Sequence, residues 1–119
     1  MFRGNIYGRE CEMQGSPYTL LVFKQEFEED LPSFIVRSYA RDYIDIEEFL
    51  RIAWAMCKTY SDDISNYERW LEEFDDDAFD ITEGKSAFDV IDAAINAEMF
   101  RQKQTIKQRF RRFIAKYIL

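Results

Sequence analysis

The feature of the sequence that most constrains its fold is the stretch 45–60, DIEEFLRIAWAMCKTY, whose apolar side chains would surround most of a helix. Asp45, followed three residues later by Glu48, resembles a capping box and predicts the start of that helix. A helix with so much apolar surface normally lies at the centre of a fold. We therefore predict that residues 45–60 form the core helix. Its apolar face is expected to comprise Ile46, Phe49, Leu50, Ala53, Cys57 and Tyr60, widened by Ile52, Trp54 and Met56, and its solvent strip Glu47, Glu48, Arg51, Ala55 and Lys58.

The composition excludes most catalytic and metal chemistry. The 119 residues contain no histidine, which removes Ser-His and Cys-His nucleophile pairs and every zinc site that needs imidazole. Cys57 falls on the apolar face of the predicted core helix, so we expect a buried thiol rather than a disulfide with Cys11. The acids cluster in an open polar run, which does not favour acid-base catalysis. We expect no enzyme activity, no cofactor and no metal site.

The chain has neither an apolar run of about 18 residues nor a signal-peptide pattern. These observations predict a cytoplasmic protein that does not cross a membrane. With 47% hydrophobic residues, the chain is expected to fold as one domain around one core.

The remaining sequence predicts a mainly α fold with a short N-terminal β-hairpin and a long C-terminal helix. Strand-like pieces on either side of Gly8 indicate the hairpin. Ser16 followed by Pro17 predicts a helix start, although the segment YTLLVF also fits a strand. A second helix is expected from Asp30 to about residue 41. The predicted parts of the single domain are a hairpin arm (1–15), a helical core (16–74), an acidic linker (75–84) and a long basic C-terminal helix (85–119).

A short helix over residues 66–74 is expected to close over the core. Ser65 and Glu68 have the spacing of a capping box, which predicts its start. The two tryptophans lie at helical spacing among Leu and Phe, so they are expected in the core rather than in a ligand pocket. The predicted core residues are Phe49, Leu50, Ala53, Trp54, Cys57 and Trp70.

The stretch EEFDDDAFDITE, residues 72–83, carries seven acids and invites a calcium hypothesis. An EF-hand loop beginning at Asp75 would place Phe79, Asp80 and Ser86 at its fifth, sixth and twelfth positions, where a ligand, glycine and glutamate are needed. The pattern does not match. A solvated acidic linker is the favoured interpretation, with a weak cation site as the alternative.

The last helix is expected to begin near Ser86, whose spacing to Asp89 suggests a cap, and its apolar residues keep the helical phase to Tyr117. Unbroken from 87 to 117, it would be about 46 Å long. It must therefore break near residues 98–103 or project from the body. Charge divides at the same place, with a net −14 in residues 1–100 and +7 in residues 101–119.

The basic segment 101–119 suggests several partners. Nucleic acid and an anionic membrane surface are less favoured, because the body is acidic and apolar side chains alternate with the basic ones. We favour self-association, in which the segment docks on the acidic surface of a neighbouring copy to give a ring or a spiral. A monomer whose tail pairs with its own linker is the alternative. The candidate contact residues are Met99, Ile106, Arg109, Phe110, Arg112, Phe113 and Tyr117 with Asp75, Asp76 and Asp77.

Residues 16–31, SPYTLLVFKQEFEEDL, and 45–74, DIEEFLRIAWAMCKTYSDDISNYERWLEEF, resemble the tail assembly chaperones of tailed bacteriophages and prophages of Gram-positive bacteria. The resemblance spans about half of the chain, and the basic end, 101–119, departs from the family's pattern. It is carried by Leu20 and Leu21 before Phe27, by Trp54, Ala55 and Met56, and by Tyr67, Trp70 and Leu71.

The resemblance implies a small acidic helical protein that coats the long tape measure protein, keeps it soluble during tail morphogenesis and helps to recruit tail tube protein. It also implies multimers and, in many members, a longer form made by ribosomal frameshifting. It supplies no catalytic residues. The alternative is a small prophage-encoded regulator or interaction protein that uses its basic C-terminal helix on nucleic acid.

Overall fold

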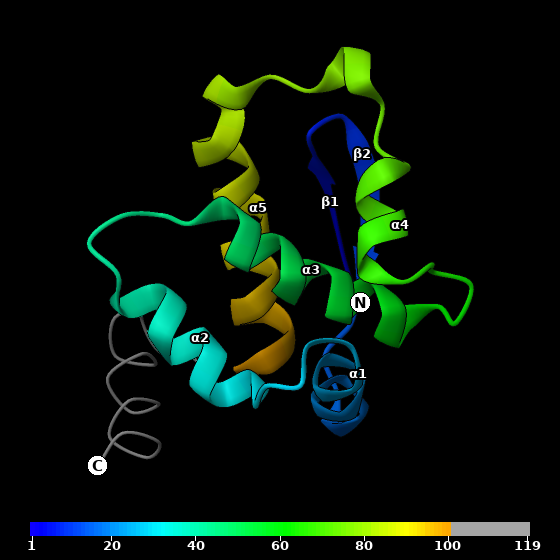
Figure 1. The fold of residues 1–119 in the computed structure, drawn as a ribbon, viewed down its shortest axis with the longest axis vertical. Helices are drawn as coiled ribbons and strands as arrows, with labels where there is room; N and C mark the ends of the chain where they lie inside the picture. Colours follow the sequence, from blue (N-terminus) through cyan, green and yellow to red (C-terminus); the bar gives the residue numbers. More distant parts are fainter. Residues whose placement is uncertain (101–119) are drawn as a thin grey trace.

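Helix α3 (Ile46–Tyr60) lies at the centre of the fold, as its apolar circumference predicts (Figure 1). The structure is a computed structural model that describes residues 1–100. Helices α1, α2, α4 and α5 and strand β2 all contact α3. Burial of apolar surface on several sides of one helix is the main favourable contribution to folding. The predicted core helix and the mainly α fold class are therefore confirmed.

The predicted solvent strip of α3 is partly wrong. Ala55 is fully buried and Glu48 is only 6% exposed, whereas Tyr60, expected on the apolar face, is 42% exposed. Elements pack on α3 from so many directions that no continuous strip stays in water. Tyr60 is the last residue of the helix, beyond most of this packing. Glu47 and Arg51, both on the predicted strip, form an ion pair with 2.6 Å between Oε2 and Nε.

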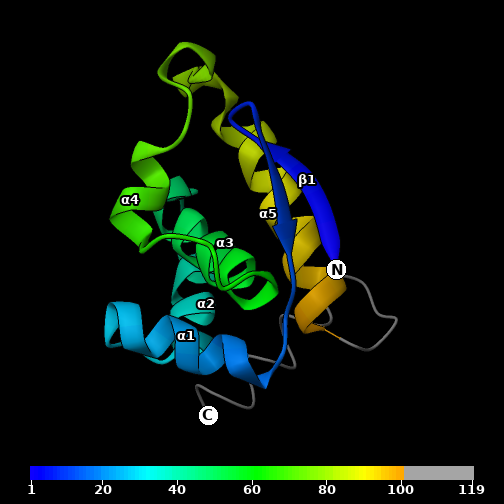
Figure 2. The same ribbon diagram turned by 90° about the vertical axis from the view of Figure 1, so that its right-hand side faces the viewer.

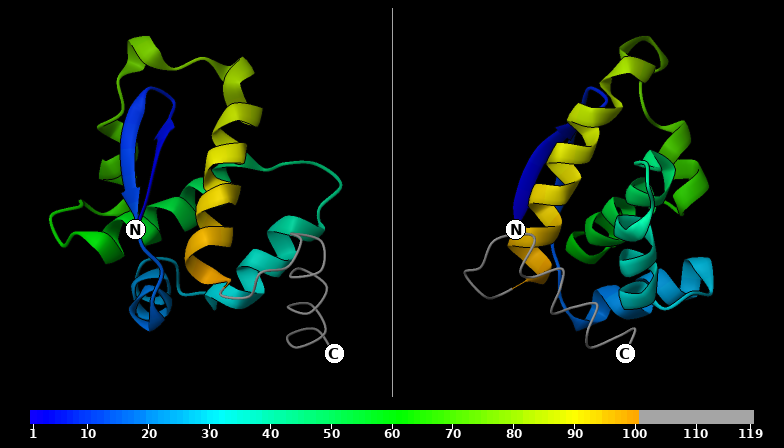
Figure 3. Two further views of the ribbon diagram at one scale, coloured as in Figure 1. Left: turned by 180° about the vertical axis from the view of Figure 1, so that it is seen from behind. Right: turned by 90° about the vertical axis from the view of Figure 1, so that its left-hand side faces the viewer.

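The N-terminal hairpin comprises β1 (Phe2–Ile6) and β2 (Arg9–Met13), paired antiparallel. Its two-residue turn has positive φ at both Tyr7 (47°) and Gly8 (81°), the backbone that matches the twist of a tight hairpin. Alternate side chains bury one face, including Ile6 and Met13. An isolated hairpin is marginal, and here it leans on α5 and α3 (Figures 2 and 3). The predicted hairpin is confirmed.

Helices α1 (Pro17–Phe27) and α2 (Leu31–Ala40) begin where their caps predict. The Ser16 hydroxyl accepts a hydrogen bond from the backbone N–H of Tyr18, and the Asp30 carboxylate accepts one from the N–H of Ser33. Such caps satisfy N–H groups that have no partner within the helix. The segment YTLLVF is thus helical, and the strand alternative is wrong.

The fourth helix, α4 (Tyr67–Glu72), is shorter than predicted and is capped by Asn66 rather than Ser65. The Asn66 side chain accepts the N–H of Arg69 at 2.9 Å. Ser65 has other partners, because its hydroxyl donates to Glu73 and its carbonyl accepts from Nε1 of Trp54. The neighbouring tertiary contacts therefore shift the helix start by one residue.

Two 3₁₀ turns, η1 (Asp76–Ala78) and η2 (Ile81–Glu83), shape the acidic linker and lead into α5 (Gly84–Met99). The predicted cap at Ser86 is wrong, because η2 runs directly into α5 and the helix begins at Gly84 without a side-chain cap. At the other end, α5 ends at Met99 and Phe100 is extended. This end falls within the span 98–103, where a break was one of the two alternatives.

Candidate partner-binding groove

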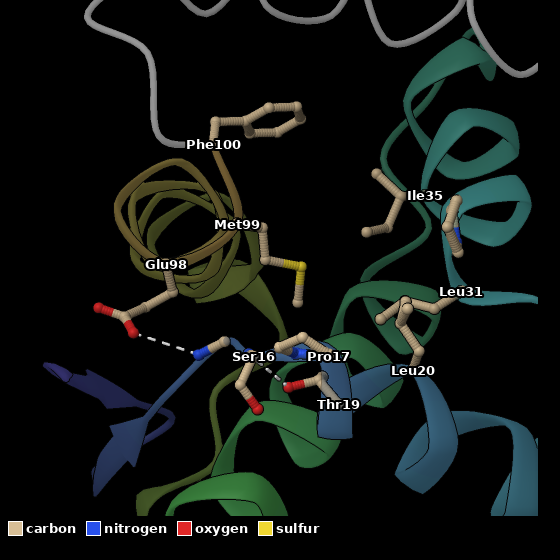
Figure 4. A pocket seen from close by; sticks show the side chains of 11 residues that line it. Ser16, Pro17, Thr19, Leu20, Leu31, Ile35, Glu98, Met99 and Phe100 are labelled. Atoms are coloured by element: carbon tan, nitrogen blue, oxygen red, sulfur yellow. Dashed lines mark hydrogen bonds between the residues drawn. The ribbon is translucent and has the colours of Figure 1, made fainter.

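An open apolar groove lies where the start of α1, the first turns of α2 and the end of α5 meet (Figure 4). Its volume is about 330 Å³. Side chains from all three helices face this common space, and Met99 points into it from the last turn of α5. The lining residues are Gly15, Ser16, Pro17, Thr19, Leu20, Leu31, Pro32, Ile35, Glu98, Met99 and Phe100.

The two helix starts give the groove its apolar walls. Each helix carries a proline in its first turn, where the missing N–H costs no hydrogen bond. Pro17 and Pro32 therefore present rings where most helix starts present polar side chains. Leu31 and Ile35, one turn apart on α2, are almost fully buried behind them. Leu20 on α1 is 47% exposed at the rim.

Glu98 fixes the end of α5 against the start of α1. Its Oε1 accepts a hydrogen bond from the backbone N–H of Gly15 at 3.1 Å, and its Oε2 lies 3.3 Å from the amino group of Met1. A buried carboxylate needs such partners. A β-carbon at position 15 would lie only 2.6 Å from the backbone oxygen of Glu98, so this close approach requires glycine. The wall formed by α5 is therefore held in place before any partner binds.

The polar atoms of Thr19 at the base of the groove already have partners. Its hydroxyl shares a 2.8 Å hydrogen bond with the hydroxyl of Thr59 on α3, and it accepts the N–H of Ser16. Thr59 in turn donates to the carbonyl of Ala55. Because these groups are satisfied internally, the groove offers mainly apolar surface to a partner. Apolar clefts with few polar groups are typical of sites that bind a ligand or a partner.

Two further apolar side chains on α1 are exposed outside the groove. Tyr18 and Leu21, which flank Thr19 and Leu20 in the sequence, are each about half exposed, but neither lines the groove. Singly exposed apolar side chains of this kind are normal on a protein surface. Within residues 1–100, no group of three His, Cys, Asp or Glu side chains is arranged to hold a metal ion.

The sequence-predicted residues are distributed between the core and two separate surfaces. Met99 lies in the groove. Asp75, Asp76 and Asp77 are exposed on the linker that precedes α5, so the fold does not bring them to Met99 at the other end of that helix. The predicted contact residues outside the described part of the chain are Ile106, Arg109, Phe110, Arg112, Phe113 and Tyr117. Of the predicted core residues, Phe49, Ala53, Trp54, Cys57 and Trp70 are buried, and Leu50 is partly buried.

The two cysteines are buried neighbours rather than a disulfide. Cys11 on β2 and Cys57 on α3 are both free thiols with about 3% exposure. The hydrogen bond between their side chains lowers the pKa of Cys11, while the same bond and burial raise the pKa of Cys57. The expectation that Cys57 is a buried small hydrophobe is confirmed.

Two ion pairs stabilise the ends of the helices around the core. Arg41 donates two hydrogen bonds to Glu48, at 2.7 and 2.8 Å, and this pairing lowers the pKa of the Glu48 carboxyl. Burial alone would raise the pKa of Glu47, but hydrogen bonds from Arg51 and Tyr67 reverse the shift and lower it. These groups have structural partners and lie outside the groove.

The groove itself could not be predicted from the sequence. Its walls come from three segments that are far apart in the chain, 15–20, 31–35 and 98–100. One signal was present, because the four consecutive apolar residues 20–23 extend around most of a helix and cannot all face one core. Val22 and Phe23 are buried, whereas Leu20 and Leu21 remain about half exposed.

In comparisons with known proteins, no family model, curated protein or solved structure matches this chain. Of the helices in residues 1–100, none has the length and apolar character needed to cross a membrane.

Proposed function

We propose that this protein is a tail assembly chaperone of a tailed phage or prophage, which binds the tape measure protein and keeps it soluble during tail morphogenesis. The observation that carries the proposal is the preformed apolar groove between α1, α2 and α5, with Leu20 exposed at its rim. A groove of this kind takes the apolar face of an amphipathic helix from a partner. The resemblance implies that the client is the long, hydrophobic tape measure protein.

The negative charge of the chain would keep the complex with its client soluble. Residues 1–100 carry a net charge of −14, and most of their acids lie on the surface rather than in the groove. When the groove covers apolar surface on the client, each bound copy adds negative charge to the complex. Like charges on neighbouring complexes repel one another and oppose aggregation.

In this proposal the chaperone acts in the bacterial cytoplasm as a homo-oligomer, a ring or a spiral that follows the length of its client. Tail tube protein is a second partner, recruited after the tape measure protein has been coated. These assignments rest on the resemblance and on the opposite charges of the body and residues 101–119.

Co-expression tests the proposal. Tape measure protein expressed alone is expected to be insoluble, and this chain should bring it into the soluble fraction in a complex that survives size-exclusion chromatography. An unrelated acidic helical protein of the same size is the control. Tape measure protein that stays insoluble, or is rescued equally by the control, would contradict the proposal. We also expect a slippery heptamer near the end of this gene and a very long open reading frame directly downstream of it.

The alternative is a small regulator that binds DNA through residues 101–119, and the +7 charge of this segment is the observation that favours it. Binding to random duplex then falls steeply with salt, because each phosphate contact releases counterions. Micromolar affinity with a steep salt slope would support the regulator. Absence of binding at 150 mM salt would exclude it.

A further inference from the structure

A second apolar hollow lies at the opposite end of α5 from the groove. It has a volume of about 480 Å³ and is formed by the hairpin turn, the start of α3, the acidic linker and the start of α5. Figure 1 shows the linker passing over the hairpin turn between α4 and α5. We call it the linker hollow, and its lining residues are Tyr7, Ile44, Ile46, Leu50, Phe79, Ile81, Gly84 and Lys85.

Apolar side chains of the linker hollow are unusually exposed. Ile81 is 80% exposed and Phe79 is 55% exposed. Their positions are set by the turns η1 and η2, in which the Asp75 carboxylate accepts the N–H of Asp77 and the Asp80 carboxylate accepts both the N–H and the hydroxyl of Thr82. The ring of Phe79 also packs on Tyr7, with centroids 5.0 Å apart. The hollow is thus held in shape, and its apolar surface faces water in the isolated chain.

The border of the linker hollow is strongly acidic. Five exposed acids lie within four residues of Phe79 or Ile81 in the sequence, namely Asp75, Asp76, Asp77, Asp80 and Glu83. Lys85 is the single basic residue in the lining, and its ammonium is paired with Asp89 at 2.7 Å. A matching partner must therefore combine apolar side chains with positive charge.

We propose that the linker hollow binds residues 101–119 of a second copy of this chain. That segment carries seven basic residues and no acid, and its apolar residues Ile106, Phe110 and Phe113 are spaced to share one helical face. Its charge of +7 complements the acidic border, and its aromatic side chains match the exposed Ile and Phe of the hollow. Apolar contact supplies the affinity, and charge fixes which surface is chosen.

The position of the hollow favours a neighbouring copy over the same chain. Gly84, at the first turn of α5, lines the linker hollow, whereas residues 101–119 follow Phe100 at the other end of that helix. A helix of 16 residues is about 24 Å long. To reach its own hollow the segment would have to turn back and span the whole length of α5. A neighbouring copy can present the segment to the hollow directly, and repeated head-to-tail contacts give a ring or a spiral.

This contact deepens the self-association included in the proposed function, but it does not use the groove that binds the client. Its test therefore uses the full chain alone, without tape measure protein. Light scattering after size-exclusion chromatography, over a series of concentrations, gives the mass and the dissociation constant of assembly. The wild-type chain is expected to exceed the monomer mass, to grow with concentration and to shrink at high salt.

Two variants each remove one side of the contact. Ile81→Ser removes the most exposed apolar side chain of the hollow and should have little effect on folding. In the contact, the neighbouring copy would cover the 80% of Ile81 that is exposed, so the variant should raise the dissociation constant of assembly about 7- to 60-fold. Phe110→Ser with Phe113→Ser removes the aromatic side chains of the segment. An equimolar mixture of the two variants should be heavier than either alone, because one retains the segment and the other retains the hollow. Circular dichroism spectra should match the wild type.

A matched pair of charge variants tests the acidic border. Asp76→Lys with Asp77→Lys should weaken assembly, whereas Asp62→Lys with Asp63→Lys makes the same charge change at exposed positions outside the hollow and should have a much smaller effect.

Four results would overturn the proposal. The first is a wild-type chain that stays monomeric at every concentration, and the second is an Ile81→Ser variant that assembles as strongly as the wild type. The third is equal weakening by the two charge pairs. The fourth is a mixture no heavier than its parts, which would assign the segment to its own chain or to another partner. None of these results would affect rescue of tape measure protein in co-expression, so client binding and self-association fail separately.

Discussion

Replacing Leu20 by serine should weaken client binding while the same change at Leu21 should not. Both leucines lie on α1 and are similarly exposed, at 47% and 49%, but only Leu20 lines the groove. The two variants therefore remove the same side chain from the same helix, with comparable losses in the free energy of unfolding. They differ in whether the lost apolar surface faces the proposed partner.

The magnitude follows from the exposed fraction of Leu20. Fully burying a leucine side chain contributes about 1.5–3 kcal/mol, so the 47% that a client can still cover is worth about 0.7–1.4 kcal/mol. The dissociation constant should then rise about 3- to 10-fold. Isothermal titration calorimetry with a soluble fragment of tape measure protein measures it for the wild type and both variants.

One control keeps the comparison interpretable. Urea unfolding of both variants should give similar midpoints and unchanged m-values, which shows that the fold is intact. Equal affinity losses for Leu20→Ser and Leu21→Ser, or a larger loss for Leu21→Ser, would refute the assignment of the groove as the client site.

Three further predictions concern the scaffold around the groove. Gly15→Ala should lower the free energy of unfolding by about 1–3 kcal/mol in urea titrations, because the new methyl group overlaps the backbone carbonyl of Glu98 in the last turn of α5. An unchanged unfolding midpoint would show that the contact between Gly15 and α5 is loose. Arg41 lowers the pKa of Glu48 below its ordinary value of 4.5, so the pairing stabilises the fold above that pH and is lost as the pH falls through the folded-state pKa. Glu48→Gln should therefore be about 1–3 kcal/mol less stable at pH 7 and should lose less stability than the wild type below pH 4.5, and parallel pH profiles would contradict this. Finally, Cys11 and Cys57 should react with a thiol reagent at least about a hundredfold more slowly in the native chain than in urea, because unfolding is needed to expose them. Rapid labelling of either thiol in the native chain would show that the hairpin opens easily.

Local rules predicted the parts of the fold that depend on local sequence. Ser16 and Asp30 cap their helices as expected, because a cap involves only a side chain and the next three residues. The hairpin turn and the central position of α3 follow from equally local signals. These are a glycine at position 8, which readily adopts a left-handed backbone, and a wide apolar face on α3. These features could be predicted without knowing any tertiary contact.

The errors arise where distant segments decide the outcome. Ala55 and Glu48 were predicted to face solvent, but elements from both halves of the chain pack around α3 and bury them. Helix α5 begins at Gly84 rather than near Ser86, because the preceding turn η2 continues directly into the helix. The groove and the linker hollow each combine segments that no periodicity connects. Neither surface could therefore be predicted without the three-dimensional arrangement of these segments.

Amide hydrogen exchange of the full chain, measured with and without a tape measure fragment, tests the central claim most directly. We predict slower exchange in the three segments that form the groove, residues 15–20, 31–35 and 98–100, with little change in the linker at 75–83. Protection confined to the linker or to α4, or no protection at any client concentration, would contradict the assignment of the groove as the client-binding site.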